Sequence, residues 1–253
     1  MDDALDILAF APHPDDVELG CAGSLILAAD KGWRVAVADL TEGEMSSRGN
    51  PVLRQQEKDQ ASAILGLTAR YSVHLPDGGI GTHPNHRIPV IELIRQTRPR
   101  IVLAPYWEDR HPDHMRSSTL VREAAFFSGV GKMGEGTPYR PKHLFYYMLH
   151  TPFDASFIID VSSVWERRMA SVQAYGSQFQ SSHREVETTL SRPEFLRALE
   201  ARAVWFGWMI QAAYGEPFLN AAPLATAEFP GLKSERQQEA NLPSGLPAYS
   251  PPA

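Results

Sequence analysis

Short apolar runs alternate with longer amphipathic runs along the first two-thirds of the chain. The apolar runs predict buried strands at residues 5–10, 34–40, 71–75, 101–105, 144–149 and 157–161. The amphipathic runs predict helices at residues 23–31, 51–65, 88–97 and 114–128, and mainly helical structure from residue 162 to about residue 214. This alternation predicts an α/β fold, a Rossmann-like, mostly parallel sheet with helices on both faces.

The end of the chain differs in composition from the rest. Residues 230–253 contain several Pro, Gly, Ser and Gln residues and have little apolar periodicity, which predicts a surface or disordered tail. Residues 1–229 are then expected to form a single domain, and 253 residues are enough to bury a substantial core.

Charge and composition exclude some classes of partner. A net charge of -6 argues against a broad nucleic-acid surface, because Lys and Arg drive phosphate binding. No apolar run approaches the roughly 20 residues that span a bilayer, and the acidic start of the chain is unlike a secretory signal. The single cysteine, Cys21, fits a reducing compartment. We therefore expect a cytoplasmic protein without a membrane partner.

Two His/Asp motifs each follow a predicted strand. The first is Ala11-Pro12-His13-Pro14-Asp15-Asp16, and the second is His111-Pro112-Asp113-His114. In open α/β sheets, ligands bind beyond the carboxyl ends of the strands, and parallel strands share that edge. The two motifs are therefore expected to lie close together.

The residue types in these motifs indicate a catalytic metal site. Zinc binds imidazole nitrogen and carboxylate oxygen, and a catalytic site uses three protein ligands with one position open for water. His13, Asp16 and His114 provide that set. Asp15 and His111 remain to move protons and to polarise a carbonyl, with His111 expected to be cationic. Zinc and iron(II) both fit such a hydrolytic site. The same ligand types also form the iron(II) oxygenase triad, although the free Asp15 favours water activation.

Together, the two motifs resemble those of the LmbE-like (PIG-L) family of N-acetylglucosamine deacetylases. The resemblance implies that His13, Asp16 and His114 bind zinc, that Asp15 is the general base and that His111 stabilises the oxyanion. Asp113 is expected to orient a histidine from behind the metal ligands. Relatives in this family are often homo-oligomers, including trimers and hexamers, so the same is expected here.

Further segments resemble the bacillithiol-pathway branch, whose enzymes deacetylate N-acetylglucosaminyl malate. They include Asp39-Leu40-Thr41-Glu42-Gly43-Glu44, Leu75-Pro76-Asp77, Ala174-Tyr175-Gly176-Ser177-Gln178-Phe179 and Gly215-Glu216-Pro217-Phe218. Arg54 and Arg110 are the candidates for holding the two carboxylates of malate, because guanidinium pairs bidentately with carboxylate. Ser47, Glu44 and Gln178 are candidates for contacts with sugar hydroxyls. Phe195 stands where some relatives have Tyr.

Several alternatives stay open. The substrate could be another N-acetylglucosamine conjugate, such as a mycothiol precursor, an antibiotic pseudodisaccharide or diacetylchitobiose. A metal-binding module without catalysis is a further alternative. His83-Pro84-Asn85-His86 imitates the second motif, but a surface histidine pair is the favoured interpretation. A dinucleotide site is disfavoured, because no G-x-G-x-x-G follows the first strand.

Overall fold

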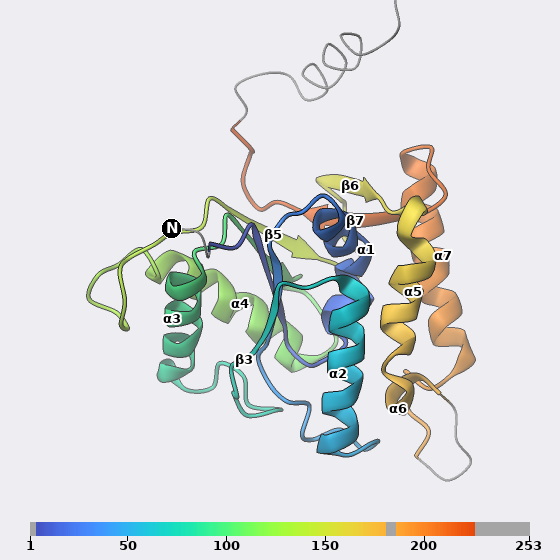
Figure 1. Ribbon diagram of the computed structural model, residues 1–253, viewed down its shortest axis with the longest axis horizontal. Coiled ribbons are helices and arrows are strands. Elements are labelled where there is room, and N and C mark those ends of the chain that lie inside the picture. The colour runs from blue at the N-terminus through green and yellow to red at the C-terminus, as the bar shows by residue number, and fades with distance from the viewer. Residues whose placement is uncertain (1–3, 181–185, 226–253) are drawn as a thin grey trace, which may run out of the picture. The chain divides into compact units, whose positions relative to one another are not determined.

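A computed structural model describes residues 4–180 and 186–225, and this part of the chain contains a seven-stranded sheet between helices (Figure 1). The strands are β1 (Ile7–Ala11), β2 (Val35–Asp39), β3 (Ala69–Ser72), β4 (Ile101–Pro105), β5 (His143–Tyr147), β6 (Phe157–Asp160) and β7 (Gly215–Leu219). The helices are α1 (Asp16–Asp30), α2 (Pro51–Leu65), α3 (Arg87–Thr97), α4 (Pro112–Phe127), α5 (Trp165–Gln173), α6 (Gly176–Phe179) and α7 (Pro193–Met209), with 3-10 turns at Pro84–His86 and Ser162–Val164.

Backbone contacts divide the chain into two units after Asn220. The first unit holds all of these elements. The expected domain boundary at residue 229 and the expected tail, residues 230–253, lie outside the described residues. Within the described part of the chain, no helix is both long and apolar enough to cross a membrane.

The strand order is β3-β2-β1-β4-β5-β7-β6. β1 pairs in parallel with both β2 and β4, and β4 pairs in parallel with β5. The chain therefore builds outward from β1 through β2 to β3, and then returns to β4 on the other side of β1. This reversal is the topological switch point at which α/β sheets bind ligands. The Rossmann-like, mostly parallel sheet predicted from the sequence is confirmed.

Helices cover both faces of the sheet, and the side chains of β1 alternate between them. Ile7 and Ala9 pack into a core that includes apolar residues of α1, α2, α5 and α7. Leu8 and Phe10 point the other way, into a core with apolar residues of α3 and α4. Figure 1 shows α3 and α4 on one side of the sheet and α2, α5 and α7 on the other.

The start of α1 was predicted wrongly. The helix begins at Asp16 and not at residue 23, because its first turns carry no amphipathic pattern: all residues from Asp16 to Ile26 are buried. Gly20 stands there because a Cβ would lie 2.2 Å from the Tyr147 ring. At Cys21 the backbone leaves the helical region (φ -152°, ψ 20°), so α1 is a kinked helix.

β7 was not predicted from the sequence. It lies between β5 and β6 and runs antiparallel to both. This strand is short and contains Pro217 and the charged Glu216, so it lacks an apolar run. Glu216 is nevertheless buried, because its carboxylate accepts hydrogen bonds from the backbone N–H groups of Gly23 (2.9 Å) and Ser24 (2.8 Å). It thereby caps the part of α1 that follows the kink.

Candidate metal centre and active site

The turn between β1 and α1 brings His13 and Asp16 to one point. The backbone N–H of His13 donates to Asp16 Oδ2 (3.0 Å), and the N–H of Asp16 donates to the His13 carbonyl (3.3 Å). Asp15 lies between them as the N-cap of α1, with a φ of 118°. Such a conformation costs a non-glycine residue about 1–3 kcal/mol. This strained turn directs the two consecutive carboxylates to different partners.

The turn between β4 and α4 is built from local interactions. Pro112 occupies the first turn of α4, where its missing N–H is not needed. His111 is the N-cap, and its Nδ1 accepts a hydrogen bond from the backbone N–H of Asp113 (3.2 Å). The N–H of His111 in turn donates to Asp109 Oδ1 (2.8 Å). Further along the first turn of α4, His114 is buried and faces the first motif.

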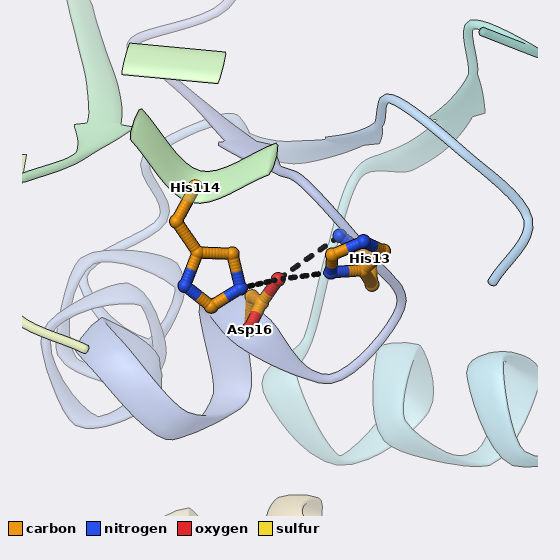
Figure 2. A group of neighbouring side chains, drawn as sticks. All are labelled: His13, Asp16 and His114. Carbon is orange, nitrogen blue, oxygen red and sulfur yellow. Dashed lines mark hydrogen bonds and ion pairs between the residues drawn. The ribbon is translucent and has the colours of Figure 1, made fainter. Parts of the chain in front are cut away.

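His13, Asp16 and His114 form a candidate metal site (Figure 2). Asp16 Oδ2 lies 3.2 Å from His13 Nδ1 and 3.3 Å from His114 Nε2. One ligand atom from each residue lies within 4.8 Å of the other two. Two imidazole nitrogens and one carboxylate oxygen are the ligand set of a catalytic zinc site, so the residues fit the ion. The sequence prediction that these side chains lie together agrees with the structure.

The electrostatics of the cluster favour a divalent cation. Burial would lower the pKa of His114, but Asp16 and Asp109 outweigh burial and raise it to about 9. Burial would raise the pKa of Asp16, but the attraction of His114 and His13 holds it well below its usual range. Burial would also lower the pKa of His13, but hydrogen bonds to Asp113, Asp16 and Asp77 raise it well above its usual range. Two imidazoles with raised pKa values thus gather around one carboxylate. A divalent cation supplies the same positive charge when it displaces the two protons.

Carboxylates stand behind both histidines. His13 Nε2 lies 3.3 Å from Asp77 Oδ1 and 3.5 Å from Asp113 Oδ2, and His114 Nδ1 lies 3.1 Å from Asp109 Oδ1. Such partners fix the orientation of a metal-binding imidazole. Asp113 was expected to orient a histidine, and it lies beside His13. No role was predicted for Asp77 or Asp109, although both follow strands whose ends meet at this edge.

His150 also belongs to this region and was not predicted. It follows β5, and its backbone N–H donates to Asp109 Oδ2 (3.0 Å). Its ring stacks on that of His114, with centroids 5.4 Å apart and an interplanar angle of 15°. Burial lowers the pKa of His150 to about 4, so the ring is neutral at pH 7. Asp109, His114 and His150 form a further group with metal-ligand geometry, as do His13, His111 and Asp113.

Asp15 is buried beside the cluster and faces Arg54. Its Oδ2 lies 3.5 Å from Arg54 Nη2, which also donates to the Pro14 carbonyl (2.8 Å). Burial raises the pKa of Asp15 to about 7, against the opposing attraction of Arg54. A carboxylate that titrates near neutral pH can accept and return a proton. Arg54 therefore influences the protonation of Asp15, a role that the sequence analysis did not consider.

The expectation that His111 is cationic is corrected by its contacts. Its Nδ1 accepts a hydrogen bond from the N–H of Asp113, and a protonated Nδ1 could not do so. Partial burial, His114 and His13 all lower the pKa of His111. The ring is therefore neutral and carries its proton on Nε2. It remains a hydrogen-bond donor, and its ring centroid lies 4.9 Å from that of His13.

A cavity of about 270 Å³, here called the metal pocket, lies over the cluster. Its lining includes His13, Asp15, Asp16, Leu19, Met45, Ser46, Arg54, Asp77, Arg110, His111, His114, His150 and Gln178. Arg54, Arg110 and Gln178 thus lie where the sequence predicted substrate contacts. Ser47 does not line the pocket, since its neighbour Ser46 takes that place. Glu44 instead lines an adjoining cavity, and its Oε1 accepts a hydrogen bond from the Asp77 N–H (2.8 Å).

Two other predicted features lie apart from the metal pocket. Phe195 lines a neighbouring cavity, where its ring centroid is 6.4 Å from that of His150. His83 and His86 form a ring pair with centroids 5.9 Å apart, and neither belongs to any of the three groups with metal-ligand geometry among the described residues.

Comparisons with known proteins agree with this geometry. Residues 8–125 match the sequence model of PIG-L, described as GlcNAc-PI de-N-acetylase. The diacetylchitobiose deacetylase of Thermococcus kodakarensis is 29% identical over 246 residues, or 88% of each chain. The probable N-acetyl-alpha-D-glucosaminyl L-malate deacetylase 2 of Bacillus subtilis is 25% identical over 217 residues, covering 79% of this chain and 93% of that protein.

A solved structure extends the likeness over nearly the whole compact unit. The conserved protein TT1542 from Thermus thermophilus superposes with a TM-score of 0.82 at 38% identity, covering 89% of this chain and 98% of that one. The PIG-L match spans both His/Asp motifs and the strands that precede them. The chain belongs to the PIG-L (LmbE-like) family.

Proposed function

We propose that this protein is a zinc-dependent hydrolase that removes the acetyl group from an N-acetylglucosamine conjugate. The proposal rests on the position of Asp15, a buried carboxylate beside the cluster of His13, Asp16 and His114 but outside it. A carboxylate with a raised pKa next to metal-binding side chains is suited to activate water. The description of the family model and the two deacetylase relatives support the same reaction.

The chain's own residues divide the chemistry between them. A zinc ion held by His13, Asp16 and His114 would lower the pKa of water and polarise the acetyl carbonyl. Asp15 takes a proton from the attacking water and later gives it to the departing amine. The Nε2–H of His111 donates to the carbonyl oxygen as negative charge develops there. Iron(II) would use the same ligands. An oxygenase reaction would leave Asp15 without a role, so we favour hydrolysis.

For the substrate we propose N-acetylglucosaminyl malate, as in bacillithiol biosynthesis. Malate brings two carboxylates, and two arginines line the metal pocket. Arg54 Nε and Nη1 are buried and have no hydrogen-bond partner in the described part of the chain. Arg110 is exposed at the mouth of the pocket. Unpaired guanidinium donors favour an anionic ligand, since a buried unsatisfied donor is costly.

Diacetylchitobiose is the rival substrate. The deacetylase that acts on it is the more similar of the two relatives, at 29% against 25% identity. Its substrate is uncharged, so it would offer no carboxylate to Arg110 or to Arg54 Nε and Nη1. Acetate release should be compared for N-acetylglucosaminyl malate, diacetylchitobiose and free N-acetylglucosamine. The malate assignment is supported if the enzyme prefers the malate conjugate, and if this preference disappears in Arg110→Gln but not in the exposed control Arg197→Gln. Equal rates on all three substrates would remove the malate assignment.

Two variants test the reaction itself. We expect Asp15→Asn to lose on the order of 10²–10⁴-fold in kcat, because the proton-transfer group is removed. Its zinc content should stay at the wild-type level. We expect His114→Ala to lose bound zinc, as measured by atomic absorption of the purified protein. Full activity in Asp15→Asn, or normal zinc content in His114→Ala, would contradict the assignment.

The family resemblance also leads us to propose a homo-oligomer, either a trimer or a hexamer. The mass in solution, measured by light scattering on the full chain, tests this proposal. A monomer at all accessible concentrations would disprove it.

A further inference from the structure

Beside the metal pocket lies a second cavity, here called the side chamber, of about 320 Å³. Its lining residues are Leu19, Arg110, Leu149, His150, Thr189, Phe195, Ala198, Leu199 and Arg202. Three of them, Leu19, Arg110 and His150, also line the metal pocket. These shared residues lie on the boundary between the two cavities.

The two cavities differ in chemistry. Polar groups that suit a sugar line the metal pocket, among them Ser46, Asp77 and Gln178. The walls of the side chamber are mostly apolar and include Leu149 and Phe195.

Arg202 does not make the side chamber a charged cavity. Its guanidinium donates to the backbone carbonyls of Leu149 and Leu19, the latter at 2.7 Å. Both Nη atoms thus already donate to the protein backbone. Beyond the boundary residues Arg110 and His150, the side chamber therefore suits an apolar group better than a carboxylate or a sugar.

The proposed reaction fixes how an amide must lie across the two cavities. The departing amine has to reach Asp15, which lines the metal pocket but not the side chamber. The sugar that carries this amine therefore occupies the polar metal pocket. The acyl group lies on the opposite side of the amide bond and points away from Asp15. A row of rings, His114, His150 and Phe195, runs from the metal ligands to the wall of the side chamber, and we place the acyl group along it.

We propose that the side chamber binds the acyl group of the substrate, and that the enzyme hydrolyses straight-chain N-acyl groups of four to eight carbons as well as acetyl. The reaction consumes one water, breaks the C–N bond and yields a fatty carboxylate and the free amine. This inference rests on the proposed deacetylase function. An acetyl methyl alone would leave most of the apolar wall without a ligand contact.

The first experiment is an acyl-chain series on one glucosamine conjugate, with acetyl, butanoyl, hexanoyl and octanoyl amides. Amine release by the zinc-loaded full chain is measured for each. We expect kcat/KM to rise by up to roughly fourfold per methylene while the chain fits, the factor that corresponds to about 0.8 kcal/mol per buried CH₂. Hexanoyl hydrolysis below one-hundredth of the acetyl rate would overturn the inference and leave the proposed function intact. Failure to release acetate from any conjugate would instead reject the proposed function.

A matched pair of variants on α7 tests the location. Ala198 is an exposed residue that lines the side chamber, whereas Ala201 is exposed on the same helix and lines neither cavity. We expect Ala198→Trp to lower the ratio of kcat/KM for the hexanoyl amide to kcat/KM for the acetyl amide at least tenfold. Ala201→Trp should leave that ratio unchanged. If Ala198→Trp instead raises KM for acetylated substrates with large aglycones, the side chamber holds the aglycone, and the inference is wrong.

Binding of the product gives a readout that does not depend on turnover. Hexanoate should bind the wild type more tightly than acetate does in titration calorimetry, and the difference should disappear in Ala198→Trp. Equal affinities for the two carboxylates in the wild type would contradict an acyl-binding role of the side chamber.

Discussion

The two helices that carry the metal-binding side chains begin in different ways. α4 begins with a cap from its own sequence, His111, followed by Pro112 in the first turn. α1 begins at the strained Asp15 and bends at Cys21. Its second half is capped by Glu216, and the hydrogen bond from the Gly23 N–H to Glu216 spans 193 positions. One half of the site is thus encoded locally, and the other depends on the completed fold.

Buried charges hold the two halves of α1. The carbonyl of Leu19, just before the kink, accepts hydrogen bonds from Arg168 Nη2 (2.8 Å) and Arg202 Nη2 (2.7 Å). On the other side of the kink, Glu216 accepts from the Ser24 hydroxyl (2.7 Å) as well as from backbone N–H groups. A helix that is interrupted inside the core needs such partners for its free carbonyls and N–H groups. The four predictions that follow test this contrast between α1 and α4.

Removing the distant cap of α1 should have the largest effect on stability. In Glu216→Ala the backbone donors at the kink and the buried Arg168 lose their acceptor, which we expect to cost about 3–5 kcal/mol of unfolding free energy. Urea denaturation of the metal-free protein measures this cost. The control is Glu194→Ala on α7, where an exposed pair with Arg197 is expected to be worth less than about 1 kcal/mol. A similar small loss in both variants would show that α1 does not depend on Glu216.

The second prediction concerns pH and the two helix starts. In the metal-free protein the pKa of Asp15 is about 7, above its unfolded value of 3.8. The folded state therefore binds the additional proton between these values, and stability falls as pH rises through this window. The contribution of Asp15 has a limiting slope of about 1.4 kcal/mol per pH unit, and Asp15→Asn should lack it.

Asp113, in the first turn of α4, should change the stability with pH in the opposite direction from Asp15. The pKa of Asp113 is lowered, because its contacts with His13 and the Gly78 N–H outweigh burial. Asp113 thus contributes stability that is present above its unfolded pKa and is lost as pH falls. Comparing Asp15→Asn and Asp113→Asn with the wild type by urea denaturation across pH 3–8 should give differences of opposite slope. Parallel pH profiles for the three proteins would refute both assignments.

The third prediction isolates the strain in the α1 turn. Glycine adopts a φ of 118° far more readily than alanine does, while both substitutions delete the carboxylate. We expect Asp15→Gly to be more stable than Asp15→Ala by about 1–3 kcal/mol in urea denaturation. Both variants should lack activity. If the two unfold at the same urea concentration, the turn stores no strain, and α1 begins as simply as α4 does.

The contrast between the locally capped α4 and the distantly supported α1 also explains which parts of the fold and the site could be predicted from the sequence. The ends of α2 were predicted correctly, because Pro51 and Gly66 mark them. The helix expected from residue 114 starts two residues earlier, at Pro112, although His111 and Pro112 mark this start in the sequence. The convergence of His13, Asp16 and His114 was also predictable, since strands β1 and β4 run in parallel to one edge. The first turns of α1 were not, because burial on all sides removes the periodic pattern.

The residues contributed by other strands were harder to find. His150 follows β5 and Asp77 follows β3, and neither lies in a motif of its own. Their proximity to the cluster depends on the strand order, which local periodicity does not specify. The choice between Ser46 and Ser47 depends on the direction of one side chain in an irregular loop. Glu216 was missed for a related reason, since a charged residue beside a proline does not suggest a buried strand.

The last prediction addresses α4 and is the smallest. Pro112→Ala leaves the ligands and the His111 cap in place and removes only the restriction of φ at the first position of the helix. We expect a loss of about 0.4–1 kcal/mol, arising mainly from the greater freedom of the unfolded chain. Zinc affinity should change less than twofold, because the contact from the Asp113 N–H to His111 Nδ1 and the position of His114 persist. A large loss of zinc affinity in this variant would mean that α4 also needs a special start. The metal site would then depend on a specific backbone conformation at the starts of both α1 and α4.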